Sequence, residues 1–562
     1  MKPPPPSAEA LSCDVLVVGG GINGAGIARD LAGRGASVVL CEQHDLAQHT
    51  SSSSTKLVHG GLRYLEYYEF SLVRKALAER EVLIKSAPHI MWPLRFVMPH
   101  DPRANFLRPV WMIRAGLFLY DHLAKREVLP GSRTVDLRSH AAGRPLKPGF
   151  TKGFVYSDGW VDDARLVVLN ALDARAHGAQ VFTRCACTQA ERGVNGWRAT
   201  LRHADGRTQA VQARALVNAA GPWTAQFLRQ QAGLQGTKSL RLVKGSHIVV
   251  PRMFEHDHAY IFQNPDKRII FAIPYEDAFT LIGTTDVEHH GAIGQAAIDD
   301  GEVRYLCEQA SRYFARGVRP ADVVWTYSGV RPLLDDESSD ASAVTRDYLL
   351  DLDLHAAPLL SVWGGKITTF RKLAEEAADL LQAPLGLRQP AWTASALMPG
   401  GDIAAWAGPG HEPPGMSAPA AARRAQAARP VAQPDAIPRF DATLARTYPW
   451  LPAPLRRRWA RSYGTRVALI VPPQADTLAA LGPEVAPHLF EVELRYLHDE
   501  EWARSADDVL WRRTKLGLHL DAAGRQAVAD WWAVHHPAEA AAASAAQRVS
   551  SPAPEVPAAP SA

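Results

Sequence analysis

Apolar and polar positions near the start of the chain predict one strand–helix–strand unit. Residues 15–18 (VLVV) are apolar and mostly β-branched, as in a buried parallel strand. A glycine cluster follows, and the spacing after it predicts a helix from about residue 22 to 34 that ends at Gly33 and Gly35. The apolar run at 37–41 predicts the next strand. The predicted fold class is therefore α/β, built around a Rossmann-like unit.

Further along the chain the pattern changes twice. Helical spacing of Leu, Val and Ala predicts an amphipathic helix over 68–87. Between residues 241 and 286, β-rich pieces alternate with turns, which predicts an antiparallel sheet in a cap or substrate domain. Beyond Pro390 the composition shifts to Ala, Pro and Arg, and helical pieces from 439 to 535 predict a small helical domain.

The chain of 562 residues, 47% of them hydrophobic, is long enough to bury more than one core. We expect two or three domains, and the composition places flexible segments at and between them. The predicted boundaries are a disordered lead-in at 1–11; a discontinuous dinucleotide domain at 12–90, 151–225 and 325–388; a cap domain at 91–150 and 226–324; a linker at 389–438; a helical C-terminal domain at 439–535; and a disordered tail at 536–562.

Charge and cysteine usage narrow the class of protein. The 62 basic and 58 acidic residues nearly balance, which argues against nucleic-acid binding. The five scattered cysteines fit neither a disulfide framework nor a zinc site, so we expect a reduced protein without a metal. The proline-rich start does not resemble a secretory signal, and nowhere do about eighteen apolar residues run together as in a membrane-spanning helix.

The glycine cluster carries the first chemical signal. Its glycines have G-x-G-x-x-G spacing directly after a strand and at the start of a helix, where backbone N–H groups can approach a pyrophosphate. Glu42 ends the second strand, where a carboxylate can accept hydrogen bonds from a ribose. The motif alone allows NAD or FAD. The predicted cofactor-binding residues of the turn are Gly19, Gly21, Ile22, Asn23 and Gly24.

A second segment with the same design lies late in the chain. An apolar strand ends at Gly364 and Gly365, and after Lys366 a threonine-capped helix begins near Thr368. A helix N-terminus aimed at the cavity can stabilise negative charge, although an ordinary strand-to-helix connection would look similar. Two distant cofactor segments favour FAD, because FAD is a long molecule.

Eight strings, in a constant order from about residue 12 to 400, resemble the FAD-dependent glycerol-3-phosphate dehydrogenases. They are SSSSTKLVHGGLRYLEYYEF (51–70), GWVDDARLV (159–167), VNAAGPW (217–223), RLVKGSHIVVP (241–251), IGTTDVE (282–288), WTYSGVRPLL (325–334), AVTRDY (343–348) and WGGKITTFRKLAE (363–375). The resemblance implies a Rossmann-like FAD-binding domain, an antiparallel-sheet cap domain and a small helical C-terminal domain. It also implies oxidation of glycerol 3-phosphate at C2 to dihydroxyacetone phosphate, with electrons passed to ubiquinone.

Residues in these strings are candidates for the two tasks that the substrate sets. Guanidinium groups suit a phosphate, and a histidine suits removal of the hydroxyl proton near neutral pH. The substrate-binding candidates are Arg331 and Arg346, then Arg63, Lys244 and Lys366; the candidate bases are His59 first and His247 second; and the further cofactor contacts are Ser52, Ser53, Thr55, Lys56 and Gly221.

Arginines and aromatic residues alternate over 103–126, which suits either a lipid interface or a core helix of the cap. With the resemblance, this segment implies peripheral contact with an anionic membrane at the cytoplasmic face, and a soluble cytoplasmic fraction is also compatible. A homodimer and a monomer both fit the sequence. Three other functions stay open: an oxidase that uses oxygen, an FAD-dependent amine or amino-acid oxidoreductase, and a non-catalytic flavin-binding regulator.

Overall fold

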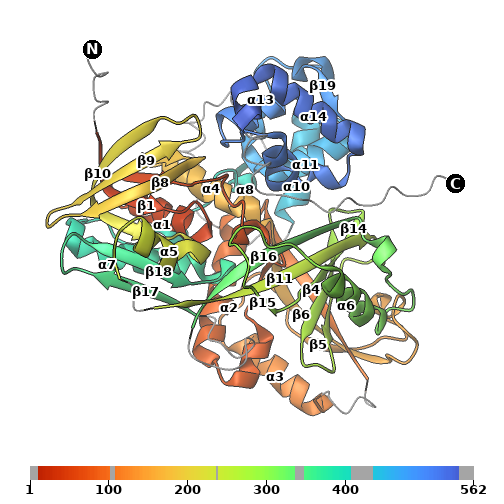
Figure 1. Ribbon diagram of the computed structural model, residues 1–562. Coiled ribbons are helices and arrows are strands. Elements are labelled where there is room, and N and C mark those ends of the chain that lie inside the picture. Colours follow the sequence, from red (N-terminus) through yellow and green to blue (C-terminus); the bar gives the residue numbers. More distant parts are fainter. Residues whose placement is uncertain (1–9, 102–107, 236–237, 336–346, 407–434, 543–562) are drawn as a thin grey trace, which may run out of the picture.

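Two sheets with their helices and one helical unit make up the described chain (Figure 1). The computed structural model describes residues 10–101, 108–235, 238–335, 347–406 and 435–542. The helical C-terminal unit, blue in Figure 1, contacts helices of the first sheet and strands of the second. Within the described residues, no helix combines the length and the apolar character that crossing a membrane requires.

The first sheet has the parallel arrangement of a dinucleotide-binding fold. Its strands follow the order β17-β18-β10-β1-β2-β7, in which β18 to β7 run parallel and β17 pairs antiparallel with β18. The antiparallel strands β9 and β8 extend from β10. The bounds are β1 (Leu11–Val18), β2 (Val38–Cys41), β7 (Gln180–Phe182), β8 (Cys185–Arg192), β9 (Trp197–His203), β10 (Thr208–Asn218), β17 (Tyr348–Asp353), β18 (Leu359–Gly364), α1 (Ile22–Gly33), α4 (Asp163–Ala176), α5 (Thr224–Gln230) and α7 (Phe370–Leu385).

Strand β1 explains why the sequence predicted this sheet correctly. Val15 and Val17 pack against α1 and α7 on one face, while Leu16 and Val18 pack against β9, β10 and α5 on the other. Because both faces are covered, the strand is a continuous apolar run, which is the pattern that identified it. The predicted first βαβ unit is confirmed, with α1 ending at Gly33.

The second sheet is largely antiparallel, as predicted. Its strands follow the order β15-β11-β14-β13-β12-β4-β6-β3, with β16 paired to β11 and β5 paired to β6. Helix α6 packs on one face and α2 and α3 on the other. The bounds are β3 (Leu57–Val58), β4 (Met91–His100), β5 (Arg133–Asp136), β6 (Lys152–Val161), β11 (Leu240–Pro251), β12 (Ala259–Gln263), β13 (Ile269–Tyr275), β14 (Phe279–Gly283), β15 (Val287–Glu288), β16 (Trp325–Leu334), α2 (Phe70–Ser86), α3 (Val110–His122) and α6 (Asp300–Ser311).

Three strands that the sequence assigned to the dinucleotide domain lie in the second sheet instead. One is the short strand β3, from the predicted segment 12–90, which pairs with β6. Strand β6, from the predicted segment 151–225, pairs with β4 along its whole length, and β16, from 325–388, pairs with β11. Both strands are apolar enough to suit either sheet, so hydrophobic pattern alone does not decide which sheet they join. The consequence is that β16 carries residues of the second sheet to the edge of the first.

The C-terminal unit has its own core, which begins earlier and ends later than predicted. Ile403 and Trp406 of α8 pack against Phe440, although the sequence placed them in a linker. The chain is helical again over 537–542, where Glu539 contacts His498, although a disordered tail was predicted from 536. The bounds are α8 (Ile403–Trp406), α10 (Ala436–Thr447), α11 (Ala453–Tyr463), α12 (Val467–Ile470), β19 (Glu484–Ala486), β20 (Leu489–Phe490), α13 (Glu491–Asp499), a π-helix η10 (Asp508–Arg513) and α14 (Ala522–His535).

Candidate functional site

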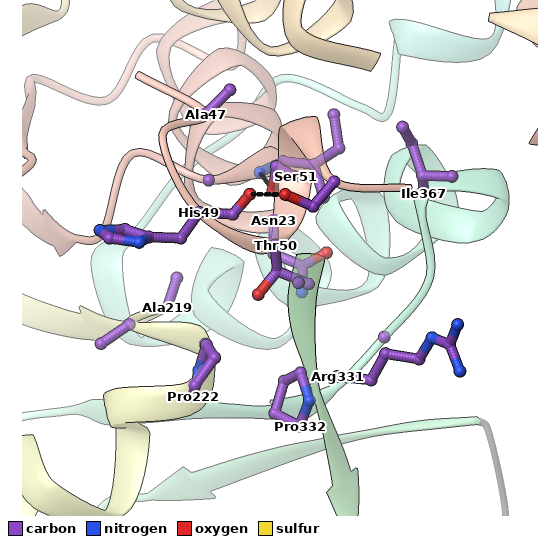
Figure 2. Close-up of a pocket in the computed structure, with 18 of the residues that line it drawn as sticks. Asn23, Ala47, His49, Thr50, Ser51, Ala219, Pro222, Arg331, Pro332 and Ile367 are labelled. Carbon is purple, nitrogen blue, oxygen red and sulfur yellow. Dashed lines mark hydrogen bonds between the residues drawn. The ribbon is translucent and has the colours of Figure 1, made fainter. Parts of the chain in front are cut away.

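A cavity of about 400 Å³ lies where the two sheets meet (Figure 2). Figure 2 shows Asn23, the loop from Ala47 to Ser51, and Pro222 around it, with Arg331 and Ile367 on one side of the view. The first sheet contributes its glycine turns and the residues that follow β2 and β10. The second sheet contributes residues of β3, β13 and β16 and Thr284, which follows β14. One cavity therefore holds both the dinucleotide motif and the candidate substrate residues.

The first glycine turn has the close packing that its spacing predicted. Gly19 has a φ of +112°, and a Cβ there would lie 2.4 Å from the carbonyl oxygen of Ala219. A Cβ on Gly24 would lie 1.8 Å from the carbonyl oxygen of Gly19, so Gly24 lets α1 begin directly against the turn. Gly21 and Ile22 line the cavity, and the Ile22 N–H donates to Ser51 Oγ at 3.0 Å. The turn leaves room for a ligand's phosphate to approach the backbone.

Glu42 lines the cavity at the end of β2. Its carboxylate accepts hydrogen bonds from the Gly20 N–H at 2.6 Å and from the His44 N–H at 2.8 Å. Burial raises the pKa of this carboxyl to about 6. The orientation of its oxygens is thereby fixed by backbone groups, as a ribose acceptor requires.

The late glycine segment meets the first turn, although 341 positions separate them in sequence. The side-chain amide of Asn23 donates to the Gly364 carbonyl oxygen at 3.2 Å. Gly364 and Gly365 have φ values of +75° and +106°, which favour glycine. Thr368 lies just before α7, and its Oγ1 accepts the His59 N–H at 3.2 Å. Both predicted cofactor segments and His59 therefore line one cavity.

Arg331 reaches the cavity from β16. Its guanidinium pairs with Asp286, and Nη2 donates to Thr284 Oγ1 at 3.0 Å. The side chain keeps 26% of its surface exposed, so part of the guanidinium faces the cavity. Lys366 also lines the cavity, with its Nζ 4.1 Å from the centre of the Tyr64 ring. Arg331 and Lys366 are therefore two cations of the cavity wall, where Asp286 pairs with Arg331 and the carboxylate residue Asp347 also lines the cavity.

The two candidate bases occupy different environments. His59 lines the cavity, whereas His247 is buried behind Thr55, with its Nε2 2.9 Å from Thr55 Oγ1. The His247 ring stacks on Tyr327, and no described group hydrogen-bonds to its Nδ1. Burial, and then the charges of Lys56 and Arg331, hold the pKa of His247 well below its usual value, so its imidazole is neutral at pH 7.

Two candidate substrate residues that the structure describes, Lys244 and Arg63, do not line the cavity. Lys244 pairs with Glu302 at 2.8 Å, and Arg63 donates to the hydroxyl of Tyr67 at 3.1 Å. A long basic side chain pairs with the nearest acceptor that the fold supplies, and the partner of Lys244 lies 58 positions away, so the sequence did not reveal it. Arg346 lies outside the described residues.

The predicted cofactor contacts in the serine-rich loop likewise include residues that line the cavity and residues that do not. Ser53 and Thr55 line the cavity, as does Gly221 with a φ of +57°. Lys56 instead forms a buried ion pair with Asp163 at 2.8 Å, and Ser52 holds the Lys56 Nζ through its carbonyl oxygen at 2.6 Å. Lys56 and Ser52 therefore stabilise the loop from behind and do not face the cavity.

Some residues at the site were missed by the sequence analysis. Thr284 and Asp286 orient Arg331, and both lie in the string IGTTDVE, whose polar residues were the available signal. Asp45 lines the cavity in a stretch, EQHDLAQH, that carries no motif. Cys185 and Cys187, which lie on strand β8, line the same cavity.

The arrangement fits a flavin dinucleotide. The glycine turn and the N-termini of α1 and α7 supply backbone donors for an anionic ligand, and Glu42 supplies an acceptor. Asn23 Oδ1 is buried, and among the described residues nothing donates to it, which leaves an acceptor for a bound molecule. The expected FAD is therefore compatible with both ends of the cavity.

Comparisons with known proteins agree. Residues 14–371 match the FAD dependent oxidoreductase family, and residues 427–537 match the C-terminal domain of alpha-glycerophosphate oxidase. The chain is 50% identical to a glycerol-3-phosphate dehydrogenase of Pseudomonas aeruginosa (95% of this chain, 97% of the relative) and 48% identical to a D-erythritol 1-phosphate dehydrogenase of Brucella abortus (93% and 98%). A glycerol-3-phosphate dehydrogenase of Bacillus halodurans, solved with FAD, superposes with a TM-score of 0.72 at 25% identity (96% and 95%). The chain therefore belongs to the FAD-dependent oxidoreductases, in the group that contains the glycerol-3-phosphate dehydrogenases.

Proposed function

We propose that this flavoprotein oxidises sn-glycerol 3-phosphate at C2 to dihydroxyacetone phosphate and passes the electrons to ubiquinone. The observation that carries the proposal is the position of Arg331 and His59 in the same cavity as the dinucleotide turn. A phosphate anchor and a proton acceptor in one cofactor cavity are the two groups that this substrate needs. The relatives named glycerol-3-phosphate dehydrogenases support the choice of substrate.

Arg331 would hold the substrate by its phosphate. Asp286 and Thr284 fix the guanidinium plane, and the N–H groups that they do not use can donate to phosphate oxygens. Lys366 adds a second positive charge at this end of the cavity. Anchoring the phosphate fixes where the C2 hydroxyl lies, and positioning of this kind supplies much of an enzyme's rate gain.

His59 would accept the proton of the C2 hydroxyl. FAD, when bound, supplies the two-electron acceptor for the hydride that leaves C2. The N-terminus of α7, which begins beside Thr368, favours the negative charge that develops in this part of the cavity. Replacing His59 with Asn should lower kcat by about 10² to 10⁴ and remove the acid limb of the pH profile. An unchanged profile in that variant, with only a raised KM, would assign His59 to binding and leave His247 to act through Thr55.

The test is anaerobic reduction of the bound flavin. Glycerol 3-phosphate should bleach the visible flavin band, and a ubiquinone analogue should restore it rapidly while oxygen restores it slowly. Recovery that is faster on oxygen would identify an oxidase. A yellow protein that glycerol 3-phosphate leaves unbleached would overturn the substrate assignment, and amines and amino acids would be tried next.

D-erythritol 1-phosphate is a second candidate substrate, because a relative named for it matches almost as closely as the glycerol-3-phosphate dehydrogenase. It carries the same phosphate and a secondary alcohol on a longer chain. Anaerobic reduction rates with both substrates, measured at equal concentrations, decide between them. A higher kcat/KM for D-erythritol 1-phosphate would replace glycerol 3-phosphate in the proposal.

We also propose that the protein meets the membrane from its cytoplasmic face, where ubiquinone is available. An exposed apolar surface supports this proposal, and its residues lie around α3 and the neighbouring turn at Leu62–Tyr67. Trp111 is 69% exposed and Phe118 61%. Exposed aromatic side chains beside arginines suit the interface of an anionic bilayer. The exposed apolar residues of this surface are Tyr67, Tyr68, Phe70, Trp111, Phe118 and Leu119.

Vesicle sedimentation tests the membrane proposal. The protein should sediment with vesicles that contain phosphatidylglycerol and less with pure phosphatidylcholine, and added salt should weaken the binding. Replacing Trp111 and Phe118 with Ser should release it. The matched control replaces Val194, which is 83% exposed in the turn between β8 and β9, with Ser. Equal binding by both variants would contradict this surface.

A further inference from the structure

The loop between β2 and the 3-10 helix at Thr50–Ser52 forms one wall of the cofactor cavity. Glu42, Asp45, Ala47 and His49 of this loop all line the cavity. The loop has a defined shape, because the Asp45 N–H donates to Gln48 Oε1 at 3.0 Å and Ala47 has a φ of +62°. It also docks on the glycine turn, where the Ala47 N–H donates to the Gly20 carbonyl oxygen at 3.3 Å.

Asp45 links this loop to the C-terminal domain. Its carboxylate is fully buried and accepts two parallel hydrogen bonds from Arg513, Nη1 to Oδ2 and Nη2 to Oδ1, both at 2.8 Å. Arg512 adds a third, from Nε at 2.6 Å. Both arginines lie on the π-helix η10, which belongs to the domain at the other end of the sequence.

A second bridge holds the neighbouring segment. The Arg184 N–H donates to the His44 carbonyl oxygen at 2.8 Å, which ties the start of β8 to the same loop. The Arg184 guanidinium donates to Asp508 at 2.7 Å, and Asp508 also pairs with Arg512. The loop and the start of β8 are therefore both attached to η10.

The ion pairs between Asp45 and the two arginines are buried, so losing one partner has a large energetic cost. Burial raises the pKa of Asp45, but the charges of Arg513 and Arg512 outweigh it and hold the pKa well below its usual value. Removing one partner of a buried pair leaves an uncompensated charge, and the attached segment must move to reach water. A shift of Asp45 would carry with it Ala47 and Glu42, which contact the glycine turn.

We propose that Arg512 and Arg513 are positioning residues for FAD, because through Asp45 they hold the loop that closes the adenosine side of the cofactor cavity. On this proposal the C-terminal domain is part of the cofactor-binding apparatus. The inference rests on FAD binding, which the family membership gives, and it does not depend on which phosphorylated alcohol is oxidised.

The experiment measures binding of FAD and of ADP, the adenosine half of the cofactor, to apoprotein of the full chain. Arg513→Gln should raise both dissociation constants at least about tenfold, and Arg513→Lys, which keeps one bond to Asp45, should recover part of the loss. The matched control is Arg175→Gln. It breaks a different contact with the C-terminal domain, from Arg175 of α4 to Glu500 at 2.6 Å. This contact is partly exposed and lies outside the cavity lining. It should change both constants by less than about twofold.

A merely structural role predicts a different result. If Arg513→Gln lowers the melting temperature but leaves both dissociation constants at the wild-type values below melting, the proposal is overturned. The same holds if FAD binding weakens while ADP binding does not. Should Arg513→Gln fail to fold, Arg512→Gln leaves the paired bonds of Arg513 in place and must still weaken both ligands. No step uses the substrate, so failure to bleach with glycerol 3-phosphate leaves this test intact.

Discussion

The two ends of the cavity are built from different materials. At the cofactor end, the groups available to a ligand are mostly backbone groups, from the glycine turns at Gly19 and Gly364 and from the N-termini of α1 and α7. At the substrate end, the contacts come from side chains, and Arg331 of the second sheet is held there by Asp286, which is distant in sequence. A backbone site depends on local conformation, while a side-chain site depends on tertiary pairing.

The difference explains what the sequence could predict. The spacing of Gly19, Gly21 and Gly24 between a strand and a helix specifies a backbone shape, and the structure has that shape. Lys244 was a candidate for the same role as Arg331, although it ranked behind it, since both are cations in matching strings. Only the fold reveals that Lys244 faces Glu302 and that Arg331 faces the cavity.

Some of the predicted domain boundaries were wrong for a related reason. Hydrophobic period predicts that a strand exists, but not which sheet it joins, so β6 and β16 were assigned to the wrong sheet. The role of Asp45 was equally invisible, because its partners Arg512 and Arg513 lie more than 460 positions away. Long-range ion pairs leave no periodic signal in a single sequence.

The largest effect on stability and FAD retention is expected from adding one methyl group to a glycine turn at the cofactor end. Gly19→Ala combines a strained φ with a Cβ 2.4 Å from a carbonyl oxygen, and it should cost about 3 kcal/mol or more and abolish retention of FAD. The control is Gly178→Ala, which has a similar φ of +97° but open space around it. It should cost only about 1 to 2 kcal/mol and keep the flavin. Flavin absorbance after purification measures the retained FAD, and the free energy of unfolding measures the stability of each variant. If the two variants lose FAD and stability equally, backbone strain alone accounts for the effect of Gly19→Ala.

The second largest effect is expected from removing the positive charge of Arg331 at the substrate end. Arg331→Met should raise the KM for glycerol 3-phosphate about 10- to 100-fold while FAD stays bound, because charge-assisted bonds to the phosphate are lost. Lys244→Met should leave KM within about threefold and instead lower the melting temperature, since buried Glu302 loses its partner. Steady-state kinetics and thermal unfolding separate the two effects. The comparison between the ends fails if both variants raise KM alike.

The smallest effect tests the carboxylate of Glu42, a side chain that faces the cofactor end. The pKa of Glu42 is raised to about 6, so it is a carboxylate above that pH and increasingly a neutral acid below it. A neutral acid is a weaker acceptor for a ribose hydroxyl, so the FAD dissociation constant should rise about tenfold between about pH 7.5 and pH 5. Glu42→Gln should bind FAD more weakly at high pH and lose this dependence.

The apoprotein should respond with the opposite sign. A carboxyl whose pKa is higher in the folded state than in the unfolded chain binds its proton more tightly when folded, so its contribution to stability increases as pH falls through about 6 toward the usual value of 4.5. The buried histidines nearby titrate the other way, because burial, followed by neighbouring positive charge, lowers the pKa of His49 to about 3. The difference in stability between wild type and Glu42→Gln isolates the carboxyl from these histidines. If acid weakens FAD binding to the same extent in both proteins, backbone groups and histidines govern the cofactor end, and Glu42 contributes little to it.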